Sequence, residues 1–443
     1  MNDTHQHVKW FRDSSPYINA HRGKVFVLHL DGEAMDHPNI GNIISDIVLL
    51  HSLGVRLVVV HGAAPQIERQ LTASGASSEF ANKVRITTRE ILPLVQQAVG
   101  TLRSDLEARL SMGLVNSPQH GAEMLVISGN FIRAKPLGVI DGVDYQHTGV
   151  VRKVNTKAIR QQLDLGATLL ISPLGYSLSG EIFNANSTQV AAEVAVALAA
   201  EKLIYFTGKG LRDANGDVIS ELQVNDIDES QLDTYAPLRL AKFACQRGVV
   251  RCHLISYAED GAALEELFTR DGTGTQVSRV SYEQIRQASA RDVPGIIELI
   301  APLEDQGILV RRSRELLESE VEHFTVIERD GMIVSCAALY PFETKGELAC
   351  LVTHPDYRDN DRGELLLESI EQQARSLGLQ ALFVLTTHTT HWFVERGFHP
   401  VQLQDLPAAR QTMYNYQRNS KLLEKPLATP LRVKLPQPGA DNA

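Results

Sequence analysis

Short apolar runs separated by helical stretches are the feature that most constrains the fold of this chain. Residues 55–60 are rich in β-branched residues and do not alternate regularly with polar ones, which is typical of a strand buried on both faces of a sheet. Other strand-like runs are residues 25–30, 124–127, 168–171, 203–206 and 249–255. Helical patterns lie at residues 42–53, 90–112, 156–165, 187–201 and 261–268. This order of strands and helices predicts an open, mainly parallel α/β sheet.

A different pattern begins near Tyr282. Ser289 and Asp292 precede an apolar helical run, as in a helix-start motif. Residues 324–328 and 333–339 flank an Asp-Gly pair, which indicates an antiparallel hairpin. We therefore predict an α/β domain over residues 1–280 with an N-terminal helix at about 8–20, a second domain over residues 281–425, and a loose, proline-containing tail over residues 426–443.

Composition narrows the classes of function. The 443 residues carry a formal net charge of −10, which argues against broad binding to nucleic acid or to an anionic membrane. No apolar stretch is long enough to span a membrane, and the polar first residues form no secretory signal. The four cysteines form no C-x-x-C pair, so we expect neither a disulfide framework nor a zinc site. These features predict a cytoplasmic protein without a metal.

Residues 351–367 form the most informative motif. A strand runs into a polar loop that opens a helix, and such a helix start can bind a diphosphate. Together with the W-F-V-E-R-G-F run at 392–398, this segment resembles the GNAT acetyltransferase superfamily. Arg358 and Gly363 match that family's diphosphate loop, whereas Asp361 replaces its first glycine. The resemblance implies a mixed-sheet α+β domain and contacts to acetyl-CoA at Cys350, Leu351, Val352, Arg358, Arg362, Gly363 and Glu364.

Four segments narrow the resemblance further. Residues 308–314, 346–355, 385–393 and 414–421 look like the acetyltransferase domain of the bacterial N-acetylglutamate synthase family. Members of that family transfer an acetyl group from acetyl-CoA to the α-amine of L-glutamate, the first step of arginine biosynthesis. The family's glutamate contacts fall on Leu309, Arg311, Arg418 and Ser420. The chemistry agrees, because glutamate presents two carboxylates and arginine offers a planar fork for each.

This reaction needs a base, because the substrate amine is an ammonium at neutral pH and must lose a proton before it attacks the thioester. The family's base falls on Glu347, which opens a strand beside the expected acetyl group, and Glu343 is a weaker candidate. The developing oxyanion needs a hydrogen-bond donor. We expect a strand N–H near Cys350 or Leu351 to supply it.

The departing thiolate also needs a proton donor. Many GNAT enzymes use a tyrosine at the position of Phe393, which cannot donate. The family's alternative hydroxyl falls on Thr386, with Tyr414 and Tyr416 as further candidates. For His388 and His391 we expect surface or structural roles rather than catalysis.

The first half of the chain resembles the amino acid kinase family, and specifically acetylglutamate kinase, at residues 22–32, 58–67 and 266–275. The family's lysine falls on His29, and the aspartate of its N-x-N-A-D motif falls on Thr188. Asp31, Ala63 and Ala64 stand where the family has glycine-rich turns. Because a kinase must neutralise phosphate charge during transfer, we expect no kinase activity and interpret this domain as a sensor.

Arginine-sensitive members of that family bind L-arginine between an N-terminal helix and the end of the domain. The resemblance implies arginine contacts at Tyr17, Glu266 and Gly272, although Glu266 could equally be an exposed helix carboxylate. It also implies a homo-oligomer, a hexamer in the family. Three alternatives stay open: a working kinase fused to an acetyltransferase, a non-enzymatic arginine sensor, and a GNAT enzyme that acetylates protein lysine.

Overall fold

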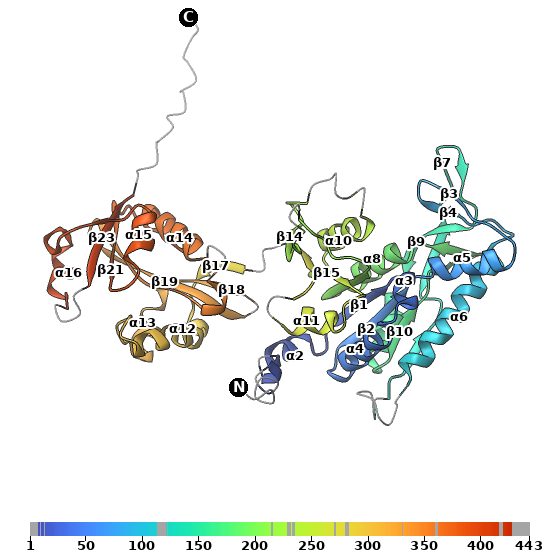
Figure 1. Ribbon diagram of the computed structural model, residues 1–443, viewed down its shortest axis with the longest axis horizontal. Coiled ribbons are helices and arrows are strands. Elements are labelled where there is room, and N and C mark those ends of the chain that lie inside the picture. Colours follow the sequence, from blue (N-terminus) through green and yellow to red (C-terminus); the bar gives the residue numbers. More distant parts are fainter. Residues whose placement is uncertain are drawn as a thin grey trace, which may run out of the picture. The chain divides into compact units, whose positions relative to one another are not determined.

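The chain forms two compact units, Met1–Val280 and Ser281–Ala443 (Figure 1). The structure, a computed structural model, describes residues 8, 10–12, 14–112, 121, 123–213, 216–227, 232, 235–269, 272–279, 283–329, 331–358, 362–415 and 420–427.

An eight-stranded sheet forms the centre of the first unit. Its strand order is β14-β16-β15-β13-β1-β2-β10-β5, and every neighbouring pair is parallel except β15 with β16. The strands are β1 (Val25–Leu30), β2 (Arg56–His61), β5 (Val126–Ser128), β10 (Thr168–Ile171), β13 (Lys202–Thr207), β14 (Glu221–Gln223), β15 (Arg251–Ser256) and β16 (Thr275–Ser278). This sheet confirms the predicted open, mainly parallel arrangement.

Helices cover both faces of this sheet, which explains why its central strands show no regular alternation with polar residues. One apolar core includes α4 (Ile40–Ser52), α5 (Ala64–Ala73), α6 (Leu92–Leu110) and α11 (Ala262–Phe268), and the other includes α7 (Thr156–Asp164), α8 (Ser187–Leu198) and α10 (Ala236–Gln246). In β2, Leu57 and Val59 pack into the first core, while Val58 and Val60 pack into the second. Alternate side chains of one strand therefore supply two cores.

The sequence patterns do not predict a small closed barrel that the first unit also contains. Its strands are β6 (Ile132–Pro136), β9 (Thr148–Val154), β11 (Leu174–Tyr176) and β12 (Ile182–Ala185). Two hairpins, β3 (Glu79–Ala81) with β4 (Val84–Ile86) and β7 (Val139–Ile140) with β8 (Val143–Asp144), and the short helices α2 (Ser15–His21) and α3 (Gly32–Asp36) also belong to this unit. The barrel strands carry charged residues such as Arg133, Lys135 and Lys153, so no compact apolar run marks them.

The second unit is built on a seven-stranded mixed sheet of order β17-β18-β19-β20-β21-β23-β22. Its strands are β17 (Glu283–Gln287), β18 (Phe324–Arg329), β19 (Met332–Phe342), β20 (Lys345–Thr353), β21 (Ala381–Thr386), β22 (His399–Pro400) and β23 (Lys421–Pro426). Among the described strands of this sheet, β20 and β21 pair in parallel and the other neighbours are antiparallel. α12 (Val293–Asp305) and α13 (Arg314–Ser319) pack into one core, and α14 (Arg362–Ser376) and α15 (Thr390–Glu395) into another. The predicted hairpin is confirmed as β18–β19.

Candidate functional site

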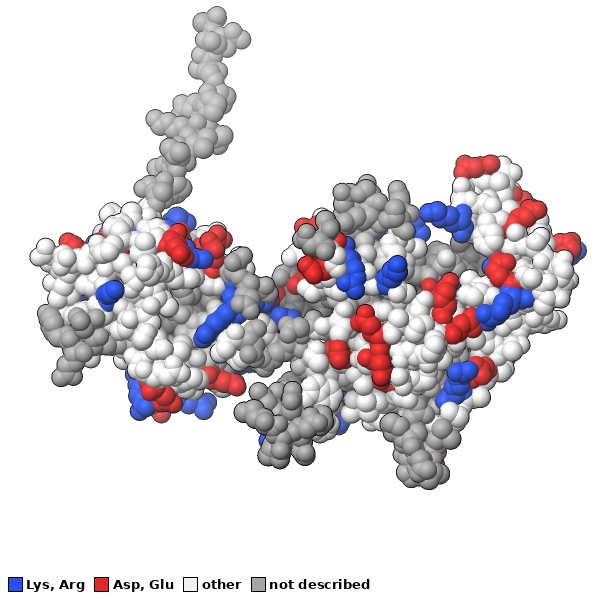
Figure 2. Space-filling view, in the orientation of Figure 1, with Lys and Arg blue, Asp and Glu red and all other residues white. Residues whose placement is uncertain are grey.

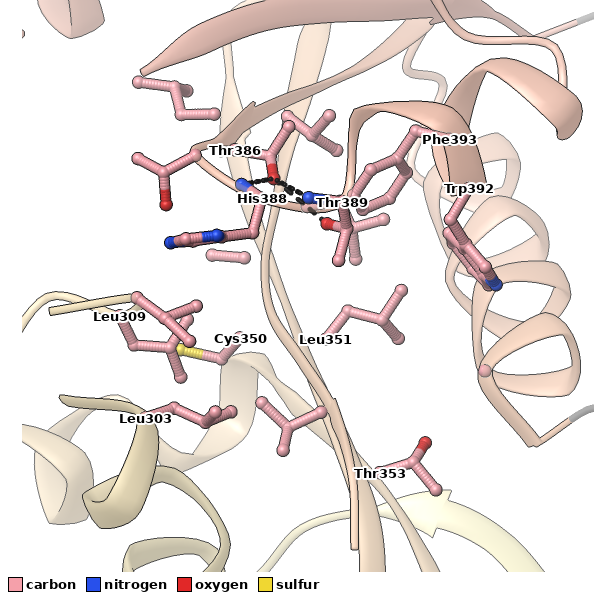
Figure 3. A pocket seen from close by; sticks show the side chains of 18 of the residues that line it. Leu303, Leu309, Cys350, Leu351, Thr353, Thr386, His388, Thr389, Trp392 and Phe393 are labelled. Atoms are coloured by element: carbon pink, nitrogen blue, oxygen red, sulfur yellow. Dashed lines mark hydrogen bonds between the residues drawn. The ribbon is translucent and has the colours of Figure 1, made fainter. Parts of the chain in front are cut away.

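A cavity opens where the two parallel strands of the second unit stop pairing. β20 and β21 pair at only three positions, from Lys345 with Ala381 to Glu347 with Phe383. The cavity, of about 610 Å³, is lined by residues 348–353 of β20 and by residues 384–389 of β21 and the turn after it (Figure 3). The end of the strand pairing, rather than any single side chain, therefore creates the space.

A β-bulge shapes β20 beside this cavity. Two residues of β20, Cys350 and Leu351, face a single residue of β19 here, and Cys350 has a φ of +51°. Its side chain lies next to Leu309 in the cavity wall (Figure 3). Burial raises the pKa of the Cys350 thiol to about 11, so the thiol is neutral at pH 7. Cys350, Leu351 and Val352 all line the cavity, and the oxyanion donor expected near the first two stays a prediction.

The beginning of α14 borders another part of the cavity, where Arg358, Gly363 and Glu364 are lining residues. A Cβ atom at Gly363 would lie 3.1 Å from Cζ2 of Trp392, so the glycine lets the Trp392 ring pack close to the start of the helix. The first N–H groups of a helix and its dipole favour an anion such as a diphosphate. Asp361 lies outside the described residues.

Arg362 does not line the cavity. Its Nε lies 2.8 Å from both carboxylate oxygens of Glu283, and its Nη1 donates to the carbonyl oxygen of Tyr357 at 2.9 Å. The guanidinium also lies over the Tyr357 ring, 5.0 Å from its centroid. The side chain is only 6% exposed. It therefore fastens the start of α14 to β17, and only its backbone is left for the acetyl-CoA contact expected from the sequence.

The hydroxyl group of Thr386 lies in the cavity wall at the end of β21 (Figure 3). Its oxygen accepts hydrogen bonds from the N–H groups of His388 (3.3 Å) and Thr389 (3.1 Å). Because two donors already occupy the oxygen, its own hydrogen is available for donation, to Thr389 Oγ1 at 3.0 Å or to a ligand. Thr387 Oγ1 in the same turn is buried with no hydrogen-bond partner among the described residues. Phe393 also lines the cavity.

Glu347, the expected base, precedes the first cavity-lining residue of β20. Both its carboxylate oxygens are held by Arg410, at 2.6 Å to Nε and 3.0 Å to Nη2. Glu343 lies exposed in the turn between β19 and β20 and does not line the cavity. Sequence patterns do not single out Arg410, because 63 residues separate it from Glu347.

The residues expected to bind glutamate are only partly brought together. Leu309 lines the cavity, whereas Arg311 is 77% exposed and pairs with Asp305 at 2.8 Å. The Ser420 carbonyl oxygen accepts a hydrogen bond from the Tyr414 hydroxyl at 2.9 Å. Arg418 and Tyr416 lie outside the described residues. His388 lines the cavity and His391 is exposed.

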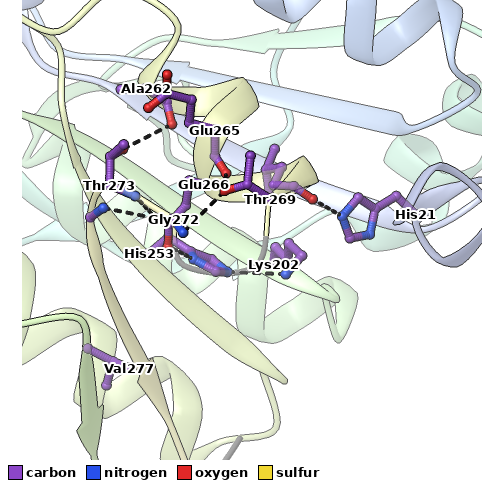
Figure 4. A network of polar contacts seen from close by, with 12 residues as sticks. His21, Lys202, His253, Ala262, Glu265, Glu266, Thr269, Gly272, Thr273 and Val277 are labelled. Atoms are coloured by element: carbon purple, nitrogen blue, oxygen red, sulfur yellow. Dashed lines mark hydrogen bonds and ion pairs between the residues drawn. The ribbon is translucent and has the colours of Figure 1, made fainter. Parts of the chain in front are cut away.

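In the first unit, Glu266 is the centre of a buried polar network (Figure 4). Its carboxylate accepts hydrogen bonds from His253 Nδ1 at 2.6 Å and from the N–H groups of Thr273 and Gly274 at 3.0 and 2.9 Å. Lys202 Nζ lies 3.2 Å from the other ring nitrogen of His253. The Glu266 side chain is 6% exposed, so its interpretation as an exposed helix carboxylate is wrong. His253 and Lys202 had no signal in the sequence, because they come from separate strands.

Charge compensation sets the ionisation of this network. Burial raises the pKa of the Glu266 carboxyl group, but the bond from His253 and the two backbone donors lower it, and the net shift is downward. Burial and the nearby Lys202 charge lower the pKa of His253. A Cβ atom at Gly272 would lie 2.3 Å from Glu266 Oε2, so Gly272 is in contact with the carboxylate. Tyr17, half-buried on α2, packs against the first core.

The residues that fall on the kinase family's phosphate-binding positions contact other residues of the first unit. His29 Nε2 lies 2.9 Å from Ser187 Oγ, and Asp31 accepts a hydrogen bond from the Gly32 N–H at 2.8 Å. Burial, with a smaller contribution from nearby His61, lowers the pKa of His29 to about 3, so it supplies no positive charge at neutral pH. A Cβ atom at Gly62 would lie only 2.8 Å from the Gly32 nitrogen. A neutral histidine thus stands where the kinase family has its lysine, and the turn at Gly62 packs closely against Gly32.

Acidic and basic side chains are interspersed on the face shown in Figure 2. Among the residues that the structure describes, no three or more His, Cys, Asp or Glu side chains form a group that could hold a metal ion. Helices long and apolar enough to cross a bilayer are also absent from the described parts of the chain.

Two family models match the chain. Residues 24–256 match the amino acid kinase family, and residues 293–398 match the acetyltransferase (GNAT) family. Amino-acid acetyltransferase from Azotobacter vinelandii is 54% identical over 430 residues, which cover 95% of this chain and 99% of that protein. The amino-acid acetyltransferase of Pseudomonas aeruginosa PAO1 is 52% identical over 429 residues, with the same coverage of both chains.

Solved structures also match across both units. N-acetylglutamate synthase from Neisseria gonorrhoeae, complexed with coenzyme A and L-arginine, has a TM-score of 0.87 and 39% identity, covering 95% of this chain and 99% of that one. The same enzyme complexed with coenzyme A and N-acetyl-glutamate has a TM-score of 0.60 at the same identity and coverage.

Proposed function

The chain belongs to the amino-acid acetyltransferase family, and from this we propose that it transfers the acetyl group of acetyl-CoA to the α-amine of L-glutamate. The products are N-acetyl-L-glutamate and CoA, the first step of arginine biosynthesis. One observation carries the proposal: a single cavity joins an anion-binding helix start at Gly363 to Leu309 and Cys350, with the carboxylate of Glu347 beside it. The complexes of the N. gonorrhoeae enzyme with coenzyme A and N-acetyl-glutamate support the same pair of ligands.

In the proposed donor site, the diphosphate of acetyl-CoA lies at Arg358 and at the N–H groups that open α14, from Arg362 to Glu364. The thioester lies along Cys350, Leu351 and Val352. Because these contacts come largely from backbone and a helix start, they fit a diphosphate without a metal ion.

In the proposed reaction, Glu347 accepts one proton from the substrate ammonium, and the neutral nitrogen attacks the thioester carbonyl carbon. The C–S bond then breaks, the departing thiolate takes the hydroxyl proton of Thr386, and the new amide nitrogen loses its second proton. The two backbone donors on the Thr386 oxygen support this role, because they stabilise negative charge on it. That second nitrogen proton passes through water to the Thr386 oxygen and restores the hydroxyl, and Glu347 releases its proton to solvent before the next cycle.

We assign the substrate carboxylates to Arg311 and Arg418, with Leu309 and Ser420 beside them. Arg311 pairs with Asp305 here, and both side chains are more than 70% exposed. Surface pairs of this kind contribute little to stability, typically ~1 kcal/mol or less, so a substrate carboxylate can replace Asp305.

We further propose that L-arginine inhibits the enzyme from the first unit, through Tyr17, Glu266 and Gly272. The buried, ionised carboxylate of Glu266 can pair with a guanidinium or an ammonium group, which supports this site. The arginine complex of the N. gonorrhoeae enzyme supports it too. We also infer a homo-oligomer, a hexamer as in the family, and a cytoplasmic location where acetyl-CoA is available.

One assay separates this function from the alternatives. CoA release is measured with L-glutamate, with and without L-arginine, beside ATP turnover with N-acetyl-L-glutamate. We expect CoA release that L-arginine suppresses, and no ATP turnover. ATP turnover without acetyl transfer would favour the kinase, and CoA release only with a lysine-containing peptide would favour a protein acetyltransferase. Arginine binding without any acetyl transfer would favour a sensor.

The regulatory site has its own test. Glu266→Gln should relieve inhibition by L-arginine and leave the uninhibited kcat unchanged, because it removes the charge that pairs with the effector. Glu265→Gln is the matched control, since that neighbouring side chain is exposed. Equal arginine sensitivity in both variants would place the effector elsewhere.

A further inference from the structure

The guanidinium of Arg410 occupies both oxygens of the proposed base. The bidentate pair with Glu347, at 2.6 and 3.0 Å, leaves the two side chains 18% and 12% exposed. Arg410 lies on the short helix α16 (Ala408–Thr412), and its Nη1 also donates to the carbonyl oxygen of Met413 at 3.2 Å. The pair is therefore largely withdrawn from water and geometrically well defined.

This arrangement opposes the chemistry assigned to Glu347. A guanidinium does not lose its proton in proteins, so Arg410 keeps its charge and its donors on Glu347. In this pair both oxygens of Glu347 already accept hydrogen bonds from Arg410 and point at the guanidinium instead of at a substrate. Separating a buried pair without replacing either partner would leave two uncompensated charges, which is strongly unfavourable. Glu347 can act as a base only when Arg410 receives another anion.

The proposed acceptor supplies both replacements. L-glutamate carries two carboxylates, one of which can accept from the guanidinium of Arg410 as well as from its assigned arginine, and an ammonium group that can take the carboxylate of Glu347. Building on the function proposed above, we propose that Arg410 locks Glu347 in the empty enzyme and that an acceptor carboxylate releases Glu347 by replacing it on the guanidinium. Charges stay paired in this exchange, and Glu347 then accepts one proton from the ammonium, which leaves the neutral amine.

The surroundings of the pair fit this exchange on both sides. Glu347 is one of the charged groups that influence the pKa of Cys350, after burial, Arg312 and Glu304, and Cys350 lines the cavity. On the side of Arg410, the helix leads within four residues to Tyr414, whose hydroxyl donates to the Ser420 carbonyl oxygen at 2.9 Å. The ion pair thus joins β20, which supplies part of the cavity wall, to the helix that leads to Tyr414.

Because Arg410 holds Glu347, the acceptor carboxylate is needed for catalysis as well as for binding. An acceptor whose exchanging carboxylate is replaced by a neutral amide leaves the pair closed, even where the rest of the molecule fits. The release of Glu347 from Arg410 therefore contributes to selectivity for an amino diacid.

Arg410→Gln tests the exchange. Rates of CoA release are compared for L-glutamate, for L-glutamine, which lacks the γ-carboxylate, and for L-isoglutamine, which lacks the α-carboxylate. The wild-type enzyme should prefer L-glutamate. In Arg410→Gln the preference over one of the amides should shrink roughly 10- to 100-fold, the range expected for a charge-assisted hydrogen bond. Arg410→Lys keeps the charge without the fork and should restore part of the preference.

A matched control separates this effect from a loss of folding. Arg286→Gln removes another bidentate pair of the second unit, with Asp292 at 2.7 and 2.8 Å, whose members have no role in the proposed reaction. It should keep the wild-type preference among the three acceptors. CoA binding, followed by the fluorescence of Trp392 in the cavity wall, should persist in both variants.

Two results would count against the exchange. If Arg410→Gln slows all three acceptors by the same factor, Arg410 only supports the fold of α16 and the lock is wrong. If the wild-type enzyme does not acetylate L-glutamate, the proposed function itself fails and the exchange fails with it.

Discussion

Each unit has a strand-to-helix turn whose geometry suits an anion, and the two differ in the charge and the cavity beside them. After β2, the turn at Gly62 is packed so tightly that a Cβ would lie 2.8 Å from the Gly32 nitrogen, and the neighbouring His29 is neutral. After β20, the turn leads to Gly363 at the edge of a cavity of about 610 Å³. The comparison teaches that a fold can keep its layout while the residues of its site change, so function must be argued from the site.

The largest expected effect concerns the site of the second unit. Glu347→Gln should lower kcat about 10²- to 10⁴-fold, the usual contribution of a general base, because glutamine cannot accept the ammonium proton. His29→Gln, the counterpart in the first unit, should leave kcat unchanged. Steady-state CoA release with L-glutamate measures both. An unimpaired kcat in Glu347→Gln would assign the base to another group.

A smaller effect is expected from adding a side chain at Gly363, beside the cavity of the second unit. Gly363→Val should raise the KM for acetyl-CoA roughly 10- to 100-fold, because its side chain meets Trp392 and keeps the diphosphate from the helix N–H groups. Gly62→Ala should instead lower the stability of the first unit by ~1–3 kcal/mol through overpacking, without changing that KM. Initial rates and thermal unfolding report the two quantities. A reversed pattern would contradict the comparison.

The smallest effect is a pH dependence of stability in the first unit. Burial lowers the pKa of His29 to about 3 and that of His61 to about 4, against 6.5 for an ordinary histidine. The unfolded chain therefore binds more protons below pH 6.5, and stability falls as the pH drops. At pH 5 each histidine should cost on the order of 2 kcal/mol.

Hydrogen exchange of the β1 and β2 amides, corrected for its intrinsic pH dependence, measures this loss. His29→Gln should remove about half of the slope between pH 6.5 and 5, since one of the two histidines remains. An unaltered slope would mean that other groups carry the pH dependence.

Local sequence patterns were enough to predict the fold class. The strands Val25–Leu30 and Thr168–Ile171 are confirmed residue for residue, because each is an apolar run bounded by polar or glycine residues. The hairpin of β18 and β19 is confirmed as well, since an Asp-Gly turn fixes it locally. The barrel strands of the first unit had no such signal, because tertiary pairing rather than an apolar run defines them.

The candidate sites were less accessible to sequence reasoning. Motifs placed Gly363 and Thr386 at the cavity, because a helix start and a strand end are local features. They could not indicate that Arg362 turns to Glu283, that Arg410 holds Glu347, or that His253 meets Glu266. Such pairs join segments that are distant in the sequence, and a single sequence contains no record of which charge meets which.

The pairing of β20 with β21 over only three residues has a consequence for the evolution of this enzyme's substrate specificity. A hollow produced by the end of a hydrogen-bonded ladder survives when the residues around it are exchanged. Evolution or engineering can therefore substitute the residues that line the cavity, for example to accept other amino acids, while the cavity itself is kept.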